Sequence, residues 1–284
     1  MAGLLSGLEK LGLEGWGDLD IFGSDEDKKT KKREPEVVKQ PVILSEEDFI
    51  YDKTFNCPVC GKEAVSKVMK TSKAKSIGMD ADLRPKYDGI DSQKYDVVLC
   101  KRCGYSALTR YFEGLMPAKA KLIKENITPN VTLTKYDTET VSYDEAMERY
   151  KLALACAVVS RAKASEKAYI CLKSAWTLRG YQEELAEQGG ADDKIEALKA
   201  QEKEYLQNAY TGFIEARKTE NFPIAGMDEK TLDYLLAQLA YTFGQMDVAA
   251  KLVAGILGSN SVSPRIKDKA RDLKDLILAA RNKK

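Results

Sequence analysis

Apolar and polar residues alternate along three short stretches in the first half of the chain. The stretches are FIYDKTFNC at residues 49–57, EAVSKVMKT at residues 63–71 and KYDVVLC at residues 94–100. Alternation with a period of two puts every second side chain on the same face, which is typical of a half-buried strand. The pattern therefore predicts a β-ribbon built from these strands.

The period of the pattern changes to three and four residues from about residue 117 onward. Ser142 and Glu145 have the spacing of a capping box, in which a serine caps the helix and a glutamate follows three residues later. Pro117 and Pro264 each stand at the start of an expected helix, and Asp228 is placed to cap another. Six helices are expected. A short one begins at residue 117, four span about residues 142–160, 164–187, 193–218 and 228–244, and the last begins at residue 264.

Small and apolar residues recur between residues 236 and 253. Their offsets are those that tetratricopeptide repeats use. These residues are Leu236, Ala237, Gly244, Ala249 and Val253, although smaller residues occupy the usual aromatic positions of that repeat. Paired helices of this length stack because each buries a face against its neighbours. We therefore expect an all-α helical-repeat domain that ends in a solvating helix.

The start of the chain contains two contrasting segments. Residues 1–23 carry leucines, a tryptophan and a phenylalanine among glycines and acids, whereas residues 24–42 contain almost nothing to bury. A charged stretch of this kind does not offset its ordering entropy, so the second segment is expected to be a disordered linker. The apolar segment is expected to dock on its own chain or on a partner, or to fray as a terminus.

Charge and hydropathy exclude several classes of protein. The 284 residues include 45 basic and 44 acidic ones, so net charge directs the chain neither to nucleic acid nor to an anionic membrane. No apolar run approaches the roughly 18 residues of a membrane span, and the start MAGLLSGLEK lacks the basic residues of a signal peptide. We expect a cytoplasmic protein that does not contact membranes, in a compartment where disulfides do not persist.

Two Cys-x-x-Cys-Gly motifs interrupt the predicted ribbon, CPVCG at residues 57–61 and CKRCG at residues 100–104. Each motif can form a tight turn in which backbone N–H groups point at the sulfurs and the glycine supplies a positive φ. Four thiolates at about 2.3 Å form a closed tetrahedral shell that suits one structural zinc ion. The predicted metal ligands are Cys57, Cys60, Cys100 and Cys103.

The paired cysteines have three other interpretations, a redox pair, a coincidence of spacing and an iron site. A redox pair belongs in a thioredoxin-like βαβ pattern, which neither motif has, and two matched pairs argue against coincidence. Iron stays open as a rival, because four thiolates on two glycine-ended turns also hold a single iron for electron transfer. Zinc is favoured because paired turns with a long insert more often serve structure, and the metal then supplies folding energy.

The residues that most enzyme mechanisms need are missing from the sequence. Histidine is absent, which removes Cys-His and Ser-His nucleophiles and the zinc hydrolase motifs that require it. There is no Gly-rich phosphate loop followed by Lys and Ser or Thr, and no dinucleotide fingerprint. Cys156 and Cys171 fall in apolar helix stripes, where cysteine is usually a small buried hydrophobe. The sequence therefore favours a protein that is not an enzyme.

The insert between the two cysteine pairs is rich in aspartate and tyrosine. Its acidic and aromatic residues are Asp80, Asp82, Asp88, Asp91, Asp96, Tyr87 and Tyr95. Two interpretations are open: a turn-rich loop whose aspartates form hydrogen bonds with their own backbone, or a carboxylate and tyrosine surface for a ligand or a second metal. The turn-forming residues of the insert favour the loop. Together the patterns predict an α+β protein in four parts. The parts are an apolar docking-like segment at residues 1–23, a disordered charged linker at 24–42, a zinc-ribbon-like metal-binding domain at 43–115 and a tetratricopeptide-like helical domain at 116–284.

The cysteine zone resembles a bacterial family catalogued as domain of unknown function 2225. The residues that carry the resemblance are CPVCGKE at 57–63, D-x-x-P-x-Y-D-G at 82–89, KYDVVLCKRCGYSA at 94–107, AYICLKSAWTLRGY at 168–181 and NFPIAGMDEKTLDYLLAQLAYTFG at 221–244. The resemblance covers about residues 45–260, and the paired cysteines with CGY are its most specific part. It implies a metal-binding ribbon joined to tetratricopeptide-like helices in the bacterial cytoplasm, and it implies no activity.

Three functions are compatible with these features. The leading hypothesis is a non-enzymatic scaffold, in which the zinc ribbon is a rigid head and the helices form a concave groove for a peptide or partner protein. The alternative is nucleic-acid binding by the ribbon, which the nearly neutral charge opposes. The basic residues for that alternative are Lys62, Lys67, Lys70, Lys73, Lys75, Lys101 and Arg102. A rubredoxin-like iron site for electron transfer is the third hypothesis.

Overall fold

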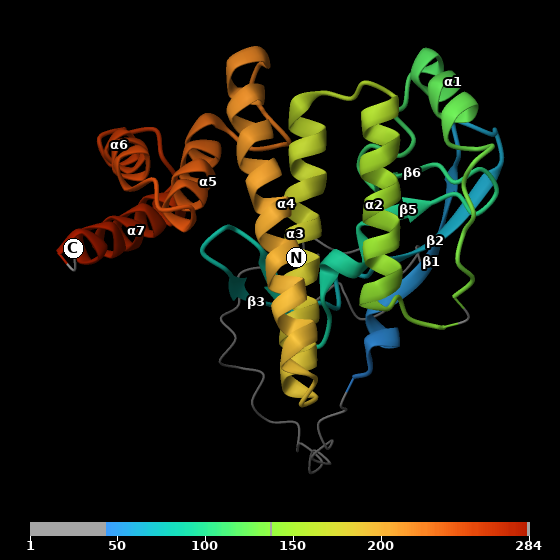
Figure 1. Cartoon of the computed structure of the whole chain (residues 1–284), viewed down its shortest axis with the longest axis horizontal. Helices are drawn as coiled ribbons and strands as arrows, with labels where there is room; N and C mark the ends of the chain where they lie inside the picture. The colour runs from blue at the N-terminus through green and yellow to red at the C-terminus, as the bar shows by residue number, and fades with distance from the viewer. Residues whose placement is uncertain (1–43, 137, 283–284) are drawn as a thin grey trace, which may run out of the picture. The chain divides into compact units, whose positions relative to one another are not determined.

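The computed structural model describes residues 44–136 and 138–282 (Figure 1). Residues 44 to 284 cluster as one compact unit. The docking-like segment and the charged linker predicted at residues 1–23 and 24–42 lie outside the described residues. The division predicted at residue 116, between a metal-binding domain and a helical domain, stays a prediction.

The alternating stretches form antiparallel hairpins, as their period predicts. β1 (Ile50–Asn56) pairs with β2 (Glu63–Met69), and β5 (Val97–Leu99) pairs with β6 (Ser106–Leu108). Phe55, Ala64, Ser66 and Val68 share the buried face of the first hairpin, while Val65 is exposed on the other face. Each hairpin is a separate two-stranded sheet, so strand hydrogen bonds do not join one hairpin to the other.

The insert between the cysteine pairs is more ordered than a turn-rich loop. It contains a small hairpin of β3 (Ser76–Met79) and β4 (Pro85–Tyr87), followed by the 3₁₀ helix η4 (Ser92–Tyr95). The strand predicted from residue 94 therefore begins only at residue 97. The reason is the Asp91 side chain, which accepts a hydrogen bond from the Gln93 N–H at 2.9 Å and caps η4. A second 3₁₀ helix, η3 (Glu46–Phe49), precedes β1.

Seven helices follow in the described part of the chain; six lie close to the predicted positions, and the one over Met246–Leu257 was not predicted as a separate helix. They are α1 (Pro117–Asn126), α2 (Tyr143–Val159), α3 (Ala164–Glu187), α4 (Asp192–Thr219), α5 (Glu229–Thr242), α6 (Met246–Leu257) and α7 (Pro264–Asn282). Ser142 and Asp228 cap α2 and α5 as predicted, each accepting a backbone N–H from three residues later. The capping box at Ser142 is only half formed, because the Glu145 carboxylate pairs with Arg149 one turn further along α2.

Helices α2, α3 and α4 stand side by side, with α3 between the other two (Figure 1). Small residues let α3 and α4 approach closely, since a Cβ at Gly212 would come within 2.8 Å of the Ala168 Cβ. α5, α6 and α7 pack on one another beyond α4. The predicted α+β class is confirmed, whereas the repeat character of the helices stays a prediction. Among the described helices, none combines the length and the apolar character that a membrane span requires.

A turn between β3 and β4 fastens this small hairpin of the insert to the helices. Its Asp82 carboxylate is bound by the Arg179 guanidinium of α3 at 2.7 Å, and Arg179 also reaches Glu202 of α4 at 2.8 Å. The Ala81 carbonyl accepts a hydrogen bond from the Tyr234 hydroxyl of α5 at 2.7 Å. Four structural elements therefore meet at one turn, which explains why its aspartates are not solvated turn formers.

Asp80 of this turn is held ionised by the arginines around it. Burial by itself would raise the pKa of Asp80, but Arg84 and Arg179 together lower it below the ordinary value of an aspartate. Arg84 is itself buried and pairs with Glu183 of α3 and with Asp80. Because both arginines are shared between the turn and α3, removing one of them leaves a partly desolvated carboxylate without its counter-charge.

Replacing Arg179 with glutamine tests whether this junction stabilises the fold. Asp82, only 7% exposed, would lose its counter-ion, so we expect Arg179→Gln to lower the free energy of unfolding by about 3 kcal/mol. Urea unfolding followed by circular dichroism measures the change. Arg271→Gln is the control, because it breaks an exposed pair with Asp268 and should barely move the midpoint. Equal shifts for the two variants would contradict the assignment.

Candidate metal centre

The two Cys-x-x-Cys-Gly turns have the same backbone hydrogen bonds. In the first turn, Gly61 N–H donates to the Cys57 carbonyl at 2.9 Å, and Cys57 N–H donates to the Lys62 carbonyl at 3.0 Å. In the second turn, Gly104 N–H donates to the Cys100 carbonyl at 2.9 Å, and Cys100 N–H donates to the Tyr105 carbonyl at 2.8 Å. The glycines have φ of 68° and 74°, the left-handed conformation expected of them.

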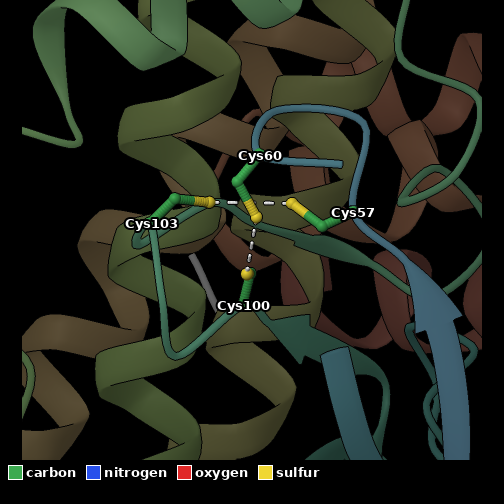
Figure 2. A group of neighbouring side chains, drawn as sticks. All are labelled: Cys57, Cys60, Cys100 and Cys103. Carbon is green, nitrogen blue, oxygen red and sulfur yellow. Dashed lines mark hydrogen bonds between the residues drawn. The ribbon is translucent and has the colours of Figure 1, made fainter. Parts of the chain in front are cut away.

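The turns bring the four predicted ligands together, one pair from each hairpin (Figure 2). The sulfurs of Cys57, Cys60, Cys100 and Cys103 all lie within 4.8 Å of one another. The Cys57 and Cys103 sulfurs are 3.6 Å apart, and those of Cys60 and Cys100 are also 3.6 Å apart. Tetrahedral zinc at about 2.3 Å from each sulfur would set neighbouring sulfurs about 3.8 Å apart. The spacing and the four soft donors therefore fit one metal ion.

The thiols also perturb one another electrostatically. Hydrogen bonds from Cys103 and Cys57 hold the pKa of the Cys100 thiol well below its ordinary value. The hydrogen bond with Cys100 raises the pKa of Cys57 to about 11, and that of Cys103 is raised by its hydrogen bonds with Cys100 and Cys57. The pKa values of the neighbouring thiols are thus driven apart, because adjacent thiolates repel each other and this repulsion limits ionisation of the whole cluster. A divalent cation removes that limit and lets every sulfur ionise.

The cluster is enclosed by the core of the β part. Cys57, Cys100 and Cys103 are buried, and Cys60 is half-buried. Phe55, Tyr105 and Phe112 pack in the same hydrophobic cluster, with Phe112 stacked on Tyr105 at a ring distance of 4.8 Å. The site is therefore closed on its inner side by aromatic and aliphatic groups. Such an environment leaves the four sulfurs as the ligands and favours a structural role.

The second turn is anchored to the helices, whereas the first is not anchored in the same way. The Thr128 hydroxyl, after α1, donates to the Cys103 carbonyl at 2.9 Å, and Cys156 of α2 lies against the Gly104 carbonyl at 3.9 Å. A Cβ at Gly104 would come within 2.4 Å of Val131, while a Cβ at Gly61 would meet nothing within 4 Å. These anchors escaped the sequence analysis because the segment after α1 has no periodic pattern to place it.

The other sequence candidates do not join this site. Cys156 and Cys171 are buried in helices, as expected, and burial raises the pKa of each thiol to about 11. Asp91 and Asp96 of the insert are engaged by the Tyr143 hydroxyl at 3.0 Å and by Lys173 at 2.6 Å. Within the described residues, the only cluster of three or more His, Cys, Asp or Glu side chains with metal-binding spacing is the cysteine quartet.

The lysines proposed as a phosphate-facing stripe do not form a uniform free surface. Lys67 pairs with Asp52 on the neighbouring strand at 3.2 Å, and Lys70 donates to the Asp48 carbonyl at 3.1 Å. Lys101 and Arg102, between the ligands of the second turn, are exposed. Lys62, Lys73 and Lys75 are exposed as well.

Comparison with known proteins gives one match. A family model described as "Uncharacterized protein conserved in bacteria (DUF2225)" matches residues 50–277, which is well over half of the chain. The match includes both cysteine turns, the insert and all but the end of the last helix. Neither the curated proteins nor the solved structures gave a match.

The two glycines offer a matched test of the turns. Gly61→Ala and Gly104→Ala both impose a side chain on a positive φ, which costs about 1 to 2 kcal/mol. Only the Gly104 variant also forces a Cβ into Val131, so it should lose roughly 1 to 3 kcal/mol more of the free energy of unfolding. Chemical unfolding of both variants measures the difference. Equal losses would show that the second turn is not packed against residue 131 as described.

Proposed function

The chain belongs to the DUF2225 family, and we propose that it is a non-enzymatic, cytoplasmic interaction scaffold built around one structural zinc ion. In this proposal the zinc orders the β part of the molecule. The layer of long helices then presents a groove that binds a peptide or a helix of a partner protein. Enzymatic turnover has no place in the proposal, because the sequence contains no histidine and none of the usual nucleotide motifs.

The observation that carries the metal part of the proposal is the mutual approach of four cysteine sulfurs within 4.8 Å. The ligands would be Cys57, Cys60, Cys100 and Cys103, and when bound the ion would neutralise the thiolates and link the two hairpins. All four positions of a tetrahedral ion would be taken by sulfur. A substrate would therefore have no open position on the metal, which supports a structural role over a catalytic one.

Zinc is preferred to iron because a closed site of four thiolates on paired turns more often has a structural role. The four-sulfur set accepts both metals, and iron would make the protein coloured and redox-active. A purified protein that is colourless and contains stoichiometric zinc after growth with abundant iron supports the zinc assignment. A red protein with stoichiometric iron would instead favour electron transfer.

The groove proposed for a partner lies over α3, between α2 and α4. It is a cavity of about 410 Å³. Its lining combines apolar side chains with a rim of both charges, and consists of Asp144, Met147, Glu148, Lys151, Leu178, Tyr181, Lys194, Ala197, Leu198 and Gln201. An apolar floor with a charged rim suits an amphipathic helix, whose apolar side chains enter the groove while its polar ones meet the rim. The apolar segment at residues 1–23, which lies outside the described residues, is proposed as a further contact with partners.

A bulky charge in the groove tests the scaffold hypothesis. Ala197 is exposed and lines the cavity, whereas Ala200 is exposed on the same helix and does not line it. We expect Ala197→Arg to abolish, and Ala200→Arg to retain, the partners recovered by crosslinked affinity capture from the native bacterium. Half of each sample is treated with nuclease, and a chain lacking residues 1–41 is captured in parallel.

The arms of this experiment separate the hypotheses. Protein partners that survive nuclease and disappear only with Ala197→Arg support the groove, and further loss with the truncated chain assigns a role to residues 1–23. Partners that disappear with nuclease would make nucleic acid the better hypothesis, with Lys101 and Arg102 as its first contacts. Identical recovery with both arginine variants would contradict binding in the groove.

A further inference from the structure

A second cavity lies beside the metal centre, on the outer side of the second cysteine turn. Its volume is about 550 Å³, within the range of small-molecule sites. Three parts of the chain enclose it: the end of β5 with the cysteine turn, the segment before α2, and α2 itself. The lining residues are Leu99, Lys101, Leu133, Thr134, Lys135, Tyr136, Glu145, Glu148 and Arg149.

Arg149 is a fixed cationic group in the wall of this cavity. Its side chain is only 8% exposed. One terminal nitrogen pairs with Glu145, and the other lies 3.5 Å from the Ser66 hydroxyl of β2. The Ser106 hydroxyl of β6 donates to the Arg149 carbonyl at 2.9 Å, which fixes the backbone beneath it. The Nε atom is buried without a hydrogen-bond partner in the described part of the chain.

An orphaned guanidinium nitrogen is costly unless a ligand or water satisfies it. Guanidinium groups carry five N–H donors and accept nothing, so their natural partners are carboxylate or phosphate oxygens. Glu145 is the only acid of the described residues that pairs with Arg149, and its contact leaves Nε unused. Arg149 is therefore a cation held in one orientation in the cavity lining, which is the arrangement that pre-organised anion sites use.

The remaining charged groups of the lining are two lysines, Lys101 and Lys135, and one acid, Glu148. Lys101 is exposed and makes no ion pair with the described residues. The acid Glu148 is occupied, because it accepts hydrogen bonds from the Thr134 N–H at 3.3 Å and the Tyr136 hydroxyl at 2.9 Å. These bonds also hold the segment before α2 against the helix. The lysine and the guanidinium are thus left facing a cavity whose acids already have partners.

One part of the cavity wall is apolar. Leu99 and Leu133 line it together with the ring of Tyr136, whose hydroxyl is already bonded to Glu148. A bare inorganic anion would leave this wall uncovered, and a cationic ligand would face Lys101 and Arg149. A ligand with a charged end and an apolar body matches both parts of the lining.

An adjoining cavity of about 380 Å³ shares the central residues of the first. The shared residues are Leu99, Lys101, Tyr136, Glu145 and Arg149. The second cavity extends toward β2 and includes the exposed Arg102 of the cysteine turn. That second cavity is also lined by Lys67 and by the acids Asp52 and Glu63, so the basic groups common to both cavities are Lys101 and Arg149.

We propose that this cavity binds a small organic anion, a carboxylate or phosphate ester that carries an aromatic or aliphatic body. Lys101 and Arg149 bind the anionic end, and Leu133 and Tyr136 contact the body. This role goes beyond the scaffold function, since it does not require a partner in the groove over α3. It adds a small-molecule site to a protein whose sequence contains no recognisable ligand motif.

Titration calorimetry on the full chain with its metal bound tests the proposal with four probes. Benzoate and phenyl phosphate have both ligand features, benzamide has the ring without the charge, and inorganic phosphate has the charge without the ring. We expect at least one of the two organic anions to bind with a dissociation constant about tenfold lower than those of benzamide and inorganic phosphate. Equal affinity for benzoate and benzamide, or no saturable binding of either organic anion, would overturn the proposal.

Variants place the binding in this cavity. Lys101→Gln should weaken the organic anion about tenfold, and Leu133→Asp should weaken it comparably by replacing an apolar contact with a like charge. Both positions are partly or fully exposed, so the fold should tolerate the changes. Lys62→Gln is the matched control, because Lys62 is an exposed lysine beside the first turn and lines neither cavity. Equal weakening by Lys62→Gln and Lys101→Gln would assign the binding to general charge and reject the site.

Discussion

The meeting of four cysteine sulfurs is the constraint on which the β part of this protein depends. Its two cysteine-bearing hairpins are separate sheets, so the sulfurs and the aromatic cluster around Phe55 and Phe112 are what bring them together. The second turn is held to the helices by Thr128 and Cys156, whereas the first turn has open space at its glycine. A metal bound by all four sulfurs would therefore transmit the order of the helices to the first hairpin.

Local patterns were enough to predict the cysteine cluster and most of the helices. The cysteine pairs are recognised by spacing within five residues, and the start of α5 is set by Asp228, whose cap involves a residue only three positions away. The start of α2 was placed correctly although its capping box is half formed. There, the Glu145 carboxylate serves a buried arginine instead of the helix end, and nothing in the spacing of the two residues indicates that choice.

Contacts between distant parts of the chain could not be predicted in the same way. Asp82 and Arg179 are 97 positions apart, and only the folded chain shows that the aspartates of the insert bind helices. The anion-binding cavity depends on a similar convergence, because Lys101 and Arg149 come from a cysteine turn and a helix whose sequences carry no shared motif. Alternation and helical period identify buried faces, but they do not say which buried faces meet.

The most direct test of the account is a zinc titration of the metal-free chain, followed by amide hydrogen exchange resolved along the sequence. The account predicts saturation at one zinc per chain. It also predicts that exchange slows most in β1, β2 and the two cysteine turns, and least in α5 to α7, which pack in a different hydrophobic cluster. Absence of stoichiometric binding, or protection that leaves both cysteine turns unchanged, would contradict a structural metal as the centre of this fold.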